Sequence, residues 1–229
     1  MTERNPFGPT ASLLLRVAFR RPGKPWGIRE LAQMAGVSPA LSTLVLRRLE
    51  RLGHVSREST GEARFLDLPR LLEDWAAWYA AAPIESYRYA MEGAETPKEM
   101  FARLSKARAH LPGRWALSAM AGASLAAPHA VFNEVHVHLA EADRLQSAWR
   151  RSLLLTPDTR GPFHILRPYY AEAGLLDMRE IRKLPVVSDI QLYLECRRYP
   201  VRGREQAEHL LHMISRDAKA AQARFQVSC

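Results

Sequence analysis

The sequence predicts an α+β fold, and three observations support this prediction. Residues 11–52 contain three segments in which apolar side chains recur at helical spacing. Residues 55–68 are typical of a short β-hairpin, and the C-terminal half alternates between strand-like and helix-like segments. Hydrophobic residues make up 47% of the chain and charged residues 25%, which is typical of a globular protein and excludes a fibrous or fully disordered one.

Residues 27–55 have the pattern of two helices joined by a short turn. The spacing predicts a helix over residues 28–35 that ends at Gly36, a residue that tolerates a positive φ. Ser38 is suited to cap the next helix, which is expected over residues 39–52. This arrangement is a helix-turn-helix.

A further helix and a hairpin flank this pair. A helix is expected over residues 11–20, and strands are expected over 55–58 and 63–68 with Gly61 at the tip between them. The order helix, helix, helix, hairpin is that of a winged helix-turn-helix, which binds double-stranded DNA through its third helix.

The outward face of the helix over residues 39–52 has the residue types that DNA recognition needs. Ala40 and Thr43 are small enough to let the backbone approach a groove, Arg47 and Arg51 can reach bases or phosphates, and Ser38 can hold a phosphate. The alternative for the arginines is a solvated helix face. With two arginines that flank the hairpin tip, the residues expected to contact DNA are Ser38, Ala40, Thr43, Arg47, Arg51, Arg57 and Arg64.

The positive charge is concentrated where this interface is expected. The chain has a formal net charge of +9. Residues 1–70 hold 12 Lys and Arg against 6 Asp and Glu, residues 71–112 hold 5 against 6, and residues 113–229 hold 16 against 12. An excess of this kind in the N-terminal third favours a polyanionic partner there.

The pattern divides the chain into three parts. Residues 1–81 are expected to form the winged helix-turn-helix domain with a following helix, residues 82–112 a connection that is irregular over 82–96, and residues 113–229 a mixed α/β domain. In that last part strands are expected over 114–118, 131–139, 152–155 and 163–166, and helices over 119–127, 142–150, 187–196 and 203–216.

The most distinctive motif is VVSDIQLYLECRRYPVRGREQAEHLLH, residues 186–212. Its main positions are Asp189, Gln191, Leu192, Tyr193 and Leu194, followed by Arg202, Gly203, Arg204 and Glu205. This motif resembles the C-terminal signature of the AbiEi-like antitoxins of type IV toxin–antitoxin systems. The small-residue segment ALSAMAGASLAAPHA, residues 116–130, resembles a helix of the same domain. Together with the N-terminal winged helix, the resemblance covers most of the chain.

The resemblance implies two activities and no catalysis. The winged helix would repress the protein's own operon, and the C-terminal domain would neutralise a cognate nucleotidyltransferase-like toxin. The residues themselves, apart from the resemblance, indicate that Arg202 and Arg204, which bracket Gly203 at a helix start, bind either an acidic partner or an internal carboxylate such as Asp189. The alternative function is a ligand-responsive winged-helix repressor whose C-terminal domain senses a small molecule.

The segment around residues 134–138 is the strongest candidate for chemistry. Glu134, His136 and His138 would share one face of a strand, and carboxylates and imidazoles are metal ligands. We expect instead that these residues form the polar outer face of a half-buried strand, so that no metal or cofactor is needed. Because a single Glu134 cannot hold the two metal ions of phosphoryl transfer, and no phosphate-binding glycine motif is present, the sequence predicts a protein that is not an enzyme.

The composition also favours a cytoplasmic location. Two cysteines far apart, Cys196 and Cys229, make neither a disulfide framework nor a zinc motif. The polar N-terminus lacks a signal-peptide core, and the apolar runs are shorter than a membrane helix needs. The expected partners are therefore DNA, bound as a dimer or as paired copies on repeated half-sites, and a toxin protein, but no membrane.

Overall fold

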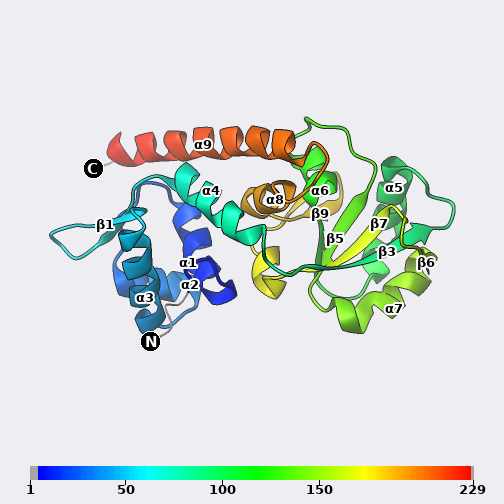
Figure 1. Ribbon diagram of the computed structural model, residues 1–229, viewed down its shortest axis with the longest axis horizontal. Helices are drawn as coiled ribbons and strands as arrows, with labels where there is room; N and C mark the ends of the chain where they lie inside the picture. The colour runs from blue at the N-terminus through cyan, green and yellow to red at the C-terminus, as the bar shows by residue number, and fades with distance from the viewer. Residues whose placement is uncertain (1–4, 228–229) are drawn as a thin grey trace. The chain divides into compact units, whose positions relative to one another are not determined.

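The computed structural model describes residues 5–227, and side chains as far as residue 221. It is an α+β structure with two compact units (Figure 1). Unit 1 comprises the described parts of residues 1–79 and 211–229, and unit 2 comprises residues 80–210. One long helix, α9 (Gly203–Val227), begins in unit 2 and continues into unit 1.

Unit 1 has three mutually packed helices followed by a small antiparallel hairpin and a further helix, which confirms the expected order of elements. These elements are α1 (Pro9–Arg20), α2 (Ile28–Ala35), α3 (Pro39–Arg51), β1 (Val55–Arg57), β2 (Ala63–Phe65) and α4 (Leu68–Tyr79).

The turn between α2 and α3 forms for the local reasons that the sequence indicated. Gly36 ends α2 with φ = 64°, a left-handed conformation. This conformation is unfavourable for residues that have a Cβ atom. Ser38 caps α3, because its Oγ accepts a hydrogen bond from the N–H of Leu41 at 3.2 Å. The angle between the two helices therefore depends on two local features, the positive φ of Gly36 and the Ser38 cap.

The core of unit 1 also includes a residue that precedes the first helix and a buried arginine. Residues 1–9 carry no pattern of a regular element, yet Phe7 is buried and stacks on Trp75 of α4 with ring centroids 6.5 Å apart. Arg16 of α1 is 1% exposed, and its guanidinium carbon lies 5.5 Å from the centre of the Trp75 ring. Trp75 therefore packs inside the N-terminal unit.

Unit 2 is built on a mixed seven-stranded sheet with helices, in the order β6-β3-β7-β5-β4-β9-β8. The pairs β5–β7 and β4–β9 are parallel, and the other pairs are antiparallel. The strands are β3 (Glu85–Met91), β4 (Trp115–Ser118), β5 (Val135–Leu139), β6 (Leu155–Pro157), β7 (Phe163–Arg167), β8 (Arg179–Ile181) and β9 (Leu184–Val186). The helical segments are α5 (Pro97–Ala107), η1 (Arg108–His110), α6 (Ala119–Ala126), α7 (Ala142–Leu153), η2 (Ala171–Leu175) and α8 (Asp189–Cys196).

The largest departure from the expected elements is β3. Residues 82–96 were expected to be irregular, but residues 85–91 form a strand between β6 and β7. Its alternation places tyrosines on one face and the polar residues Ser86 and Arg88 on the other, and these polar residues obscure the strand signal.

The strand expected over 152–155 is also wrong, because α7 continues to Leu153 and the strand starts only at Leu155.

The two faces of the sheet are covered by different helices. Tyr89 donates to Gln146 of α7, and Trp115 packs edge-on against Trp149 of the same helix, so α7 covers this face. The opposite face contacts α6 and α8. It carries His136 and His138, and all five residues of β5 are buried. The expectation that β5 has a polar outer face is therefore wrong, because α8 covers that face.

None of the helices within the described part of the chain is both long enough and apolar enough to cross a bilayer.

Candidate functional site

The helix α3 presents one exposed side at the surface of unit 1. Ala40, Leu44, Arg47 and Arg51 follow one another at intervals of three or four residues and are all exposed, with the half-buried Thr43 beside them. The opposite side is buried in the core through Leu41, Ser42, Val45, Leu46 and Leu49. The structure thus brings the small residues and the two arginines of this helix onto one side.

Leu44 is the residue of this surface that sequence reasoning missed. It is 43% exposed and lies between Ala40 and Arg47 on the same side of α3. A leucine in a helical pattern is first assigned to the core, which is why the pattern alone did not single it out. Its phase relative to Ala40 and Arg47 was the signal that could have found it.

Two hydroxyl groups at the beginning of α3 bond to the helix itself. Ser38 caps the helix, and the hydroxyl of Thr43 donates to the carbonyl of Pro39 at 2.9 Å. Both side chains are therefore held in one orientation at the end of α3 where N–H groups lack helical partners. This end of the helix dipole is the one that attracts anions.

The arginines that flank the hairpin are held by neighbours in unit 1. Arg64 contacts Glu58 at 2.5 Å and donates to the carbonyl of Gly23 at 3.2 Å. Arg57 lies 3.8 Å from Glu50 and reaches the carbonyl of Gly61 at 3.4 Å. These contacts reduce the availability of both hairpin arginines for a ligand.

Arg47 differs from the hairpin arginines. Its side chain is exposed, and it makes no ion pair or side-chain hydrogen bond with the side chains that the structure describes, which extend to residue 221. Arg51 is also exposed, but unlike Arg47 it interacts with another group of the protein. The cation of α3 that is most available to a ligand is therefore Arg47.

The two arginines of the C-terminal motif do not meet the expected carboxylate. Asp189 pairs with Arg179 at 2.5 Å, whereas Arg204 contacts Glu208, one turn along α9, at 3.1 Å. The expected internal pair between Asp189 and Arg202 or Arg204 is therefore wrong. Arg202 and Arg204 lie at the exposed beginning of α9.

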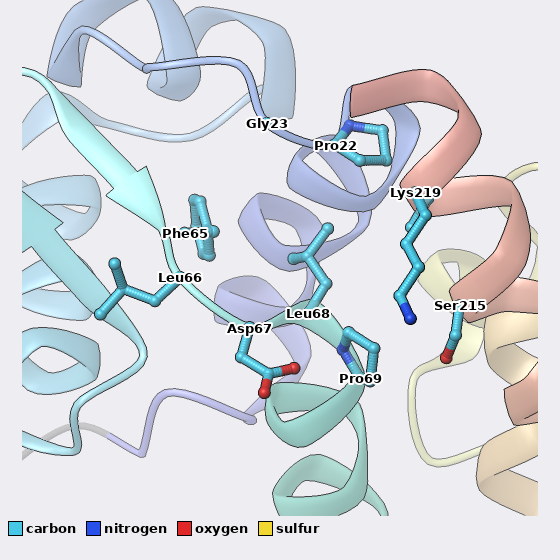
Figure 2. Close-up of a pocket in the computed structure, with 10 residues that line it drawn as sticks. Pro22, Gly23, Phe65, Leu66, Asp67, Leu68, Pro69, Ser215 and Lys219 are labelled. Atoms are coloured by element: carbon cyan, nitrogen blue, oxygen red, sulfur yellow. The ribbon is translucent and has the colours of Figure 1, made fainter. Parts of the chain in front are cut away.

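Unit 1 also contains a pocket of about 260 Å³ (Figure 2). Figure 2 shows Phe65, Leu68 and Pro69 on one wall and Ser215 and Lys219 of α9 on the other. Apolar side chains line it together with the polar side chains of Asp67, Ser215 and Lys219, a mixture that is also found in small-molecule sites.

Unit 2 contains a row of polar side chains that crosses four strands. Arg88 on β3 is paired in register with His164 on β7, His164 with His136 on β5, and His136 with Ser118 on β4. Residues directly paired across strands share one face of the sheet. Four polar side chains from distant parts of the sequence thus lie side by side on the face that contacts α8.

A carboxylate lies beside this row of side chains. Oε1 of Glu134 accepts from Arg88 at 2.9 Å and lies 3.6 Å from Nε2 of His164, while Oε2 accepts from the Tyr199 hydroxyl at 2.6 Å. The ring centroids of His136 and His164 are 4.2 Å apart. One ligand atom from each of Glu134, His136 and His164 lies within 4.8 Å of the other two. We refer to these three residues as the Glu134–His136–His164 cluster.

Burial keeps the imidazoles of the cluster neutral. It lowers the pKa of His136 to about 3, and the neighbouring imidazole of His164 acts in the same direction. Burial also lowers the pKa of His164, although Glu134 opposes the shift. Their lone pairs are therefore not protonated at neutral pH.

His138 belongs to a different network. It contacts Glu195 of α8, which also accepts from Gln191 at 2.9 Å and from the N–H of Ala119 at 3.2 Å. Burial opposes ionisation of Glu195, but these partners together hold its pKa below the ordinary value. The sequence grouped Glu134 and His136 with His138. In the structure the third member of the group is His164 instead, because the strand order places β7 beside β5.

Comparison with protein-family models, with curated proteins and with solved structures finds no match to this chain.

Proposed function

We propose that unit 1 is a winged helix-turn-helix that binds double-stranded DNA, with α3 in the major groove and the hairpin as its wing. The observation that carries this proposal is the exposed side of α3, which combines small residues at its beginning with arginines towards its end. A helix with this distribution enters the groove with its N-terminal residues closest to the bases.

Each residue of this side has a role in the proposal. Ala40 and Thr43 allow close approach, Arg47 donates to a guanine edge or a phosphate, and Leu44 makes apolar contact with a thymine methyl group. Ser38 lies at the end of α3 that favours a phosphate. Because Arg57 and Arg64 already have partners, we assign them secondary contacts with the DNA backbone.

We propose further that the protein is a cytoplasmic transcription regulator of the AbiEi-like antitoxin type. The support is the resemblance of residues 186–212 and the charge excess of residues 1–70. Unit 2 would then bind a toxin protein, with Arg202 and Arg204 at the exposed beginning of α9 as contacts. Failure of the chain to co-purify with the product of an adjacent toxin-like gene would count against this part of the proposal.

The DNA-binding proposal is tested by Arg47→Ala, with Arg151→Ala as the matched control. Arg151 is an exposed arginine of α7 in unit 2, so its removal changes the net charge equally. Arg47→Ala should weaken binding to the DNA upstream of the protein's own reading frame by roughly 5- to 150-fold, corresponding to ~1–3 kcal/mol.

Fluorescence anisotropy at several salt concentrations gives both the affinity and its salt dependence. Arg151→Ala should match the wild-type protein. If Arg47→Ala leaves the affinity and the salt slope unchanged, α3 is not the recognition helix.

A further inference from the structure

The Glu134–His136–His164 cluster contains polar atoms that the protein itself does not satisfy. Nδ1 of His136 is buried and makes no hydrogen bond within the described chain, and Nε2 of His164 has Oε1 of Glu134 at 3.6 Å, beyond hydrogen-bond distance. A buried nitrogen lone pair without a partner is unfavourable, and native structures rarely leave one without a reason. Two such atoms beside one carboxylate indicate a missing electrophile.

We propose that Glu134, His136 and His164 bind one divalent transition-metal ion of the Zn²⁺ type. The ion would lie between β5 and β7, on the face of the sheet that contacts α8. The cluster is independent of the proposed DNA interface, which is in unit 1.

The backbone already places the three ligands close to what an ion requires. His136 and His164 are directly paired on adjacent parallel strands, and Glu134 directly precedes β5 on the same face as His136. Ligand atoms around a tetrahedral Zn²⁺ ion are roughly 3.3 Å apart, given bonds of about 2.0 Å. Since the present separations are within 4.8 Å, small side-chain rotations suffice and the strands need not move.

The residues around the cluster orient the ligands in the manner of an outer metal shell. Ser86 Oγ lies 3.0 Å from Nδ1 of His164, which leaves Nε2 of that ring for the ion. Arg88 and Tyr199 hold the two oxygens of Glu134. Hydrogen bonds to the far side of a ligand imidazole and to a ligand carboxylate are usual around protein-bound metals.

The donor set selects the class of ion. Two imidazoles and one carboxylate suit Zn²⁺ and its borderline neighbours, whereas Mg²⁺ and Ca²⁺ require mostly oxygen ligands. The partly exposed side chains of Arg88 and Glu134, 37% and 25% accessible, give the ion a route from solvent. Three protein ligands leave one coordination position for water or a further ligand.

Zinc binding to the full chain, after treatment with a chelator, tests this proposal. Isothermal titration with Zn²⁺ and visible absorption with Co²⁺ measure the stoichiometry and the coordination. The wild-type protein should bind one equivalent and melt at a higher temperature with the ion present. Glu134→Gln should weaken zinc binding at least tenfold, and His164→Ala should abolish it.

A surface histidine pair supplies the matched control. His129 and His209 stack at 4.6 Å near Glu205 and are the obvious place for adventitious zinc. The double variant His129→Ala with His209→Ala should keep the full affinity. Glu134→Gln keeps the shape of the side chain and an acceptor oxygen for Arg88, while its NH2 group can donate to the Tyr199 hydroxyl. It should therefore fold even where His164→Ala does not, as circular dichroism without metal can verify. Absence of stoichiometric binding, or loss of binding only in the surface double variant, would overturn the proposal.

Discussion

At the scale of single residues, the neighbours of an ionisable side chain decide what it is available to do. Arg47 and Arg64 belong to the same unit and carry the same charge. Arg64 is held by Glu58 and a carbonyl oxygen, whereas Arg47 extends from α3 without a partner in the described chain. A guanidinium that already has hydrogen bonds must break them to bind a phosphate, so equal charges contribute unequally to binding.

His54 provides a prediction at this scale. The side chain is 1% exposed and lies 2.9 Å from Asp74 of α4. Burial lowers its pKa below the ordinary value of 6.5, although Asp74 opposes the shift. The unfolded chain therefore takes up a proton at a higher pH than the folded one, so this residue's contribution to stability is complete above pH 6.5 and falls as the pH decreases below it.

Urea unfolding at pH 7.5 and at pH 5.5 measures this contribution. The free energy of unfolding should fall less between these pH values for His54→Gln than for the wild-type protein. Because His136 and His164 titrate in both proteins, the difference isolates His54. Equal pH dependence of the two proteins would contradict the assignment.

At the scale of elements, short turns determine how neighbouring helices and strands meet. The angle between α2 and α3 depends on the left-handed Gly36 and on the Ser38 cap. The beginning of α9 depends on Gly203, since a Cβ atom there would overlap the carbonyl oxygen of Cys196 at the end of α8. Glycine is therefore required for its left-handed conformation at Gly36 and for close approach of the chain at Gly203.

Gly36→Ala tests the first of these turns, with Gly27→Ala as its matched control. Gly27 has φ = −64°, and a Cβ atom there meets nothing nearer than 3.9 Å. Gly36→Ala should lower the free energy of unfolding by ~1–2 kcal/mol, because alanine disfavours a left-handed conformation. Gly27→Ala should lower it by less, roughly 0.5–1 kcal/mol, because the backbone conformation is unchanged and only the preference for glycine over alanine at the N-cap of α2 is lost.

Thermal and urea unfolding of the two variants provide the comparison. If both variants lose the same stability, the left-handed conformation of Gly36 is not what holds the turn. If the proposed function is right, Gly36→Ala should also weaken DNA binding, because it alters the placement of α3.

At the scale of the whole molecule, the described C-terminal residues belong to the same compact unit as the N-terminal residues. Residues 211–227 belong to unit 1, although the preceding part of α9 belongs to unit 2. The half-buried residues of this stretch include Leu211, Met213 and Ile214, and Ser215 lines the pocket beside Leu68. The N-terminal unit is therefore built from both ends of the sequence.

Truncation after Leu210 tests the contribution of this helical segment. Removing it should lower the melting temperature by roughly 5 °C or more, because apolar surface of the N-terminal unit becomes exposed. On the proposed function, the truncated protein should also bind DNA more weakly. A truncated protein that melts and binds like the full chain would show that residues 211–229 do not support the unit.

The sequence by itself determined the N-terminal helices, their turn and the hairpin. Each depends on interactions within a few residues, such as the Ser38 cap, the positive φ of Gly36 and the periodicity of α3. The same local rules indicated helices α6 to α9 and the strands β4, β5 and β7, because an amphipathic segment keeps its apolar spacing whichever element it packs against. They did not indicate β3, β8 or β9.

Only the tertiary structure decided which strands are neighbours, and hence which polar residues meet. The row from Arg88 through His164 and His136 to Ser118 joins four strands whose order in the sheet differs from their order in the chain. Sequence spacing grouped His138 with His136, because alternation along one strand is a local property. Strand order and the placement of α8 arise from long-range packing, and these separate His138 and bring His164 into the cluster.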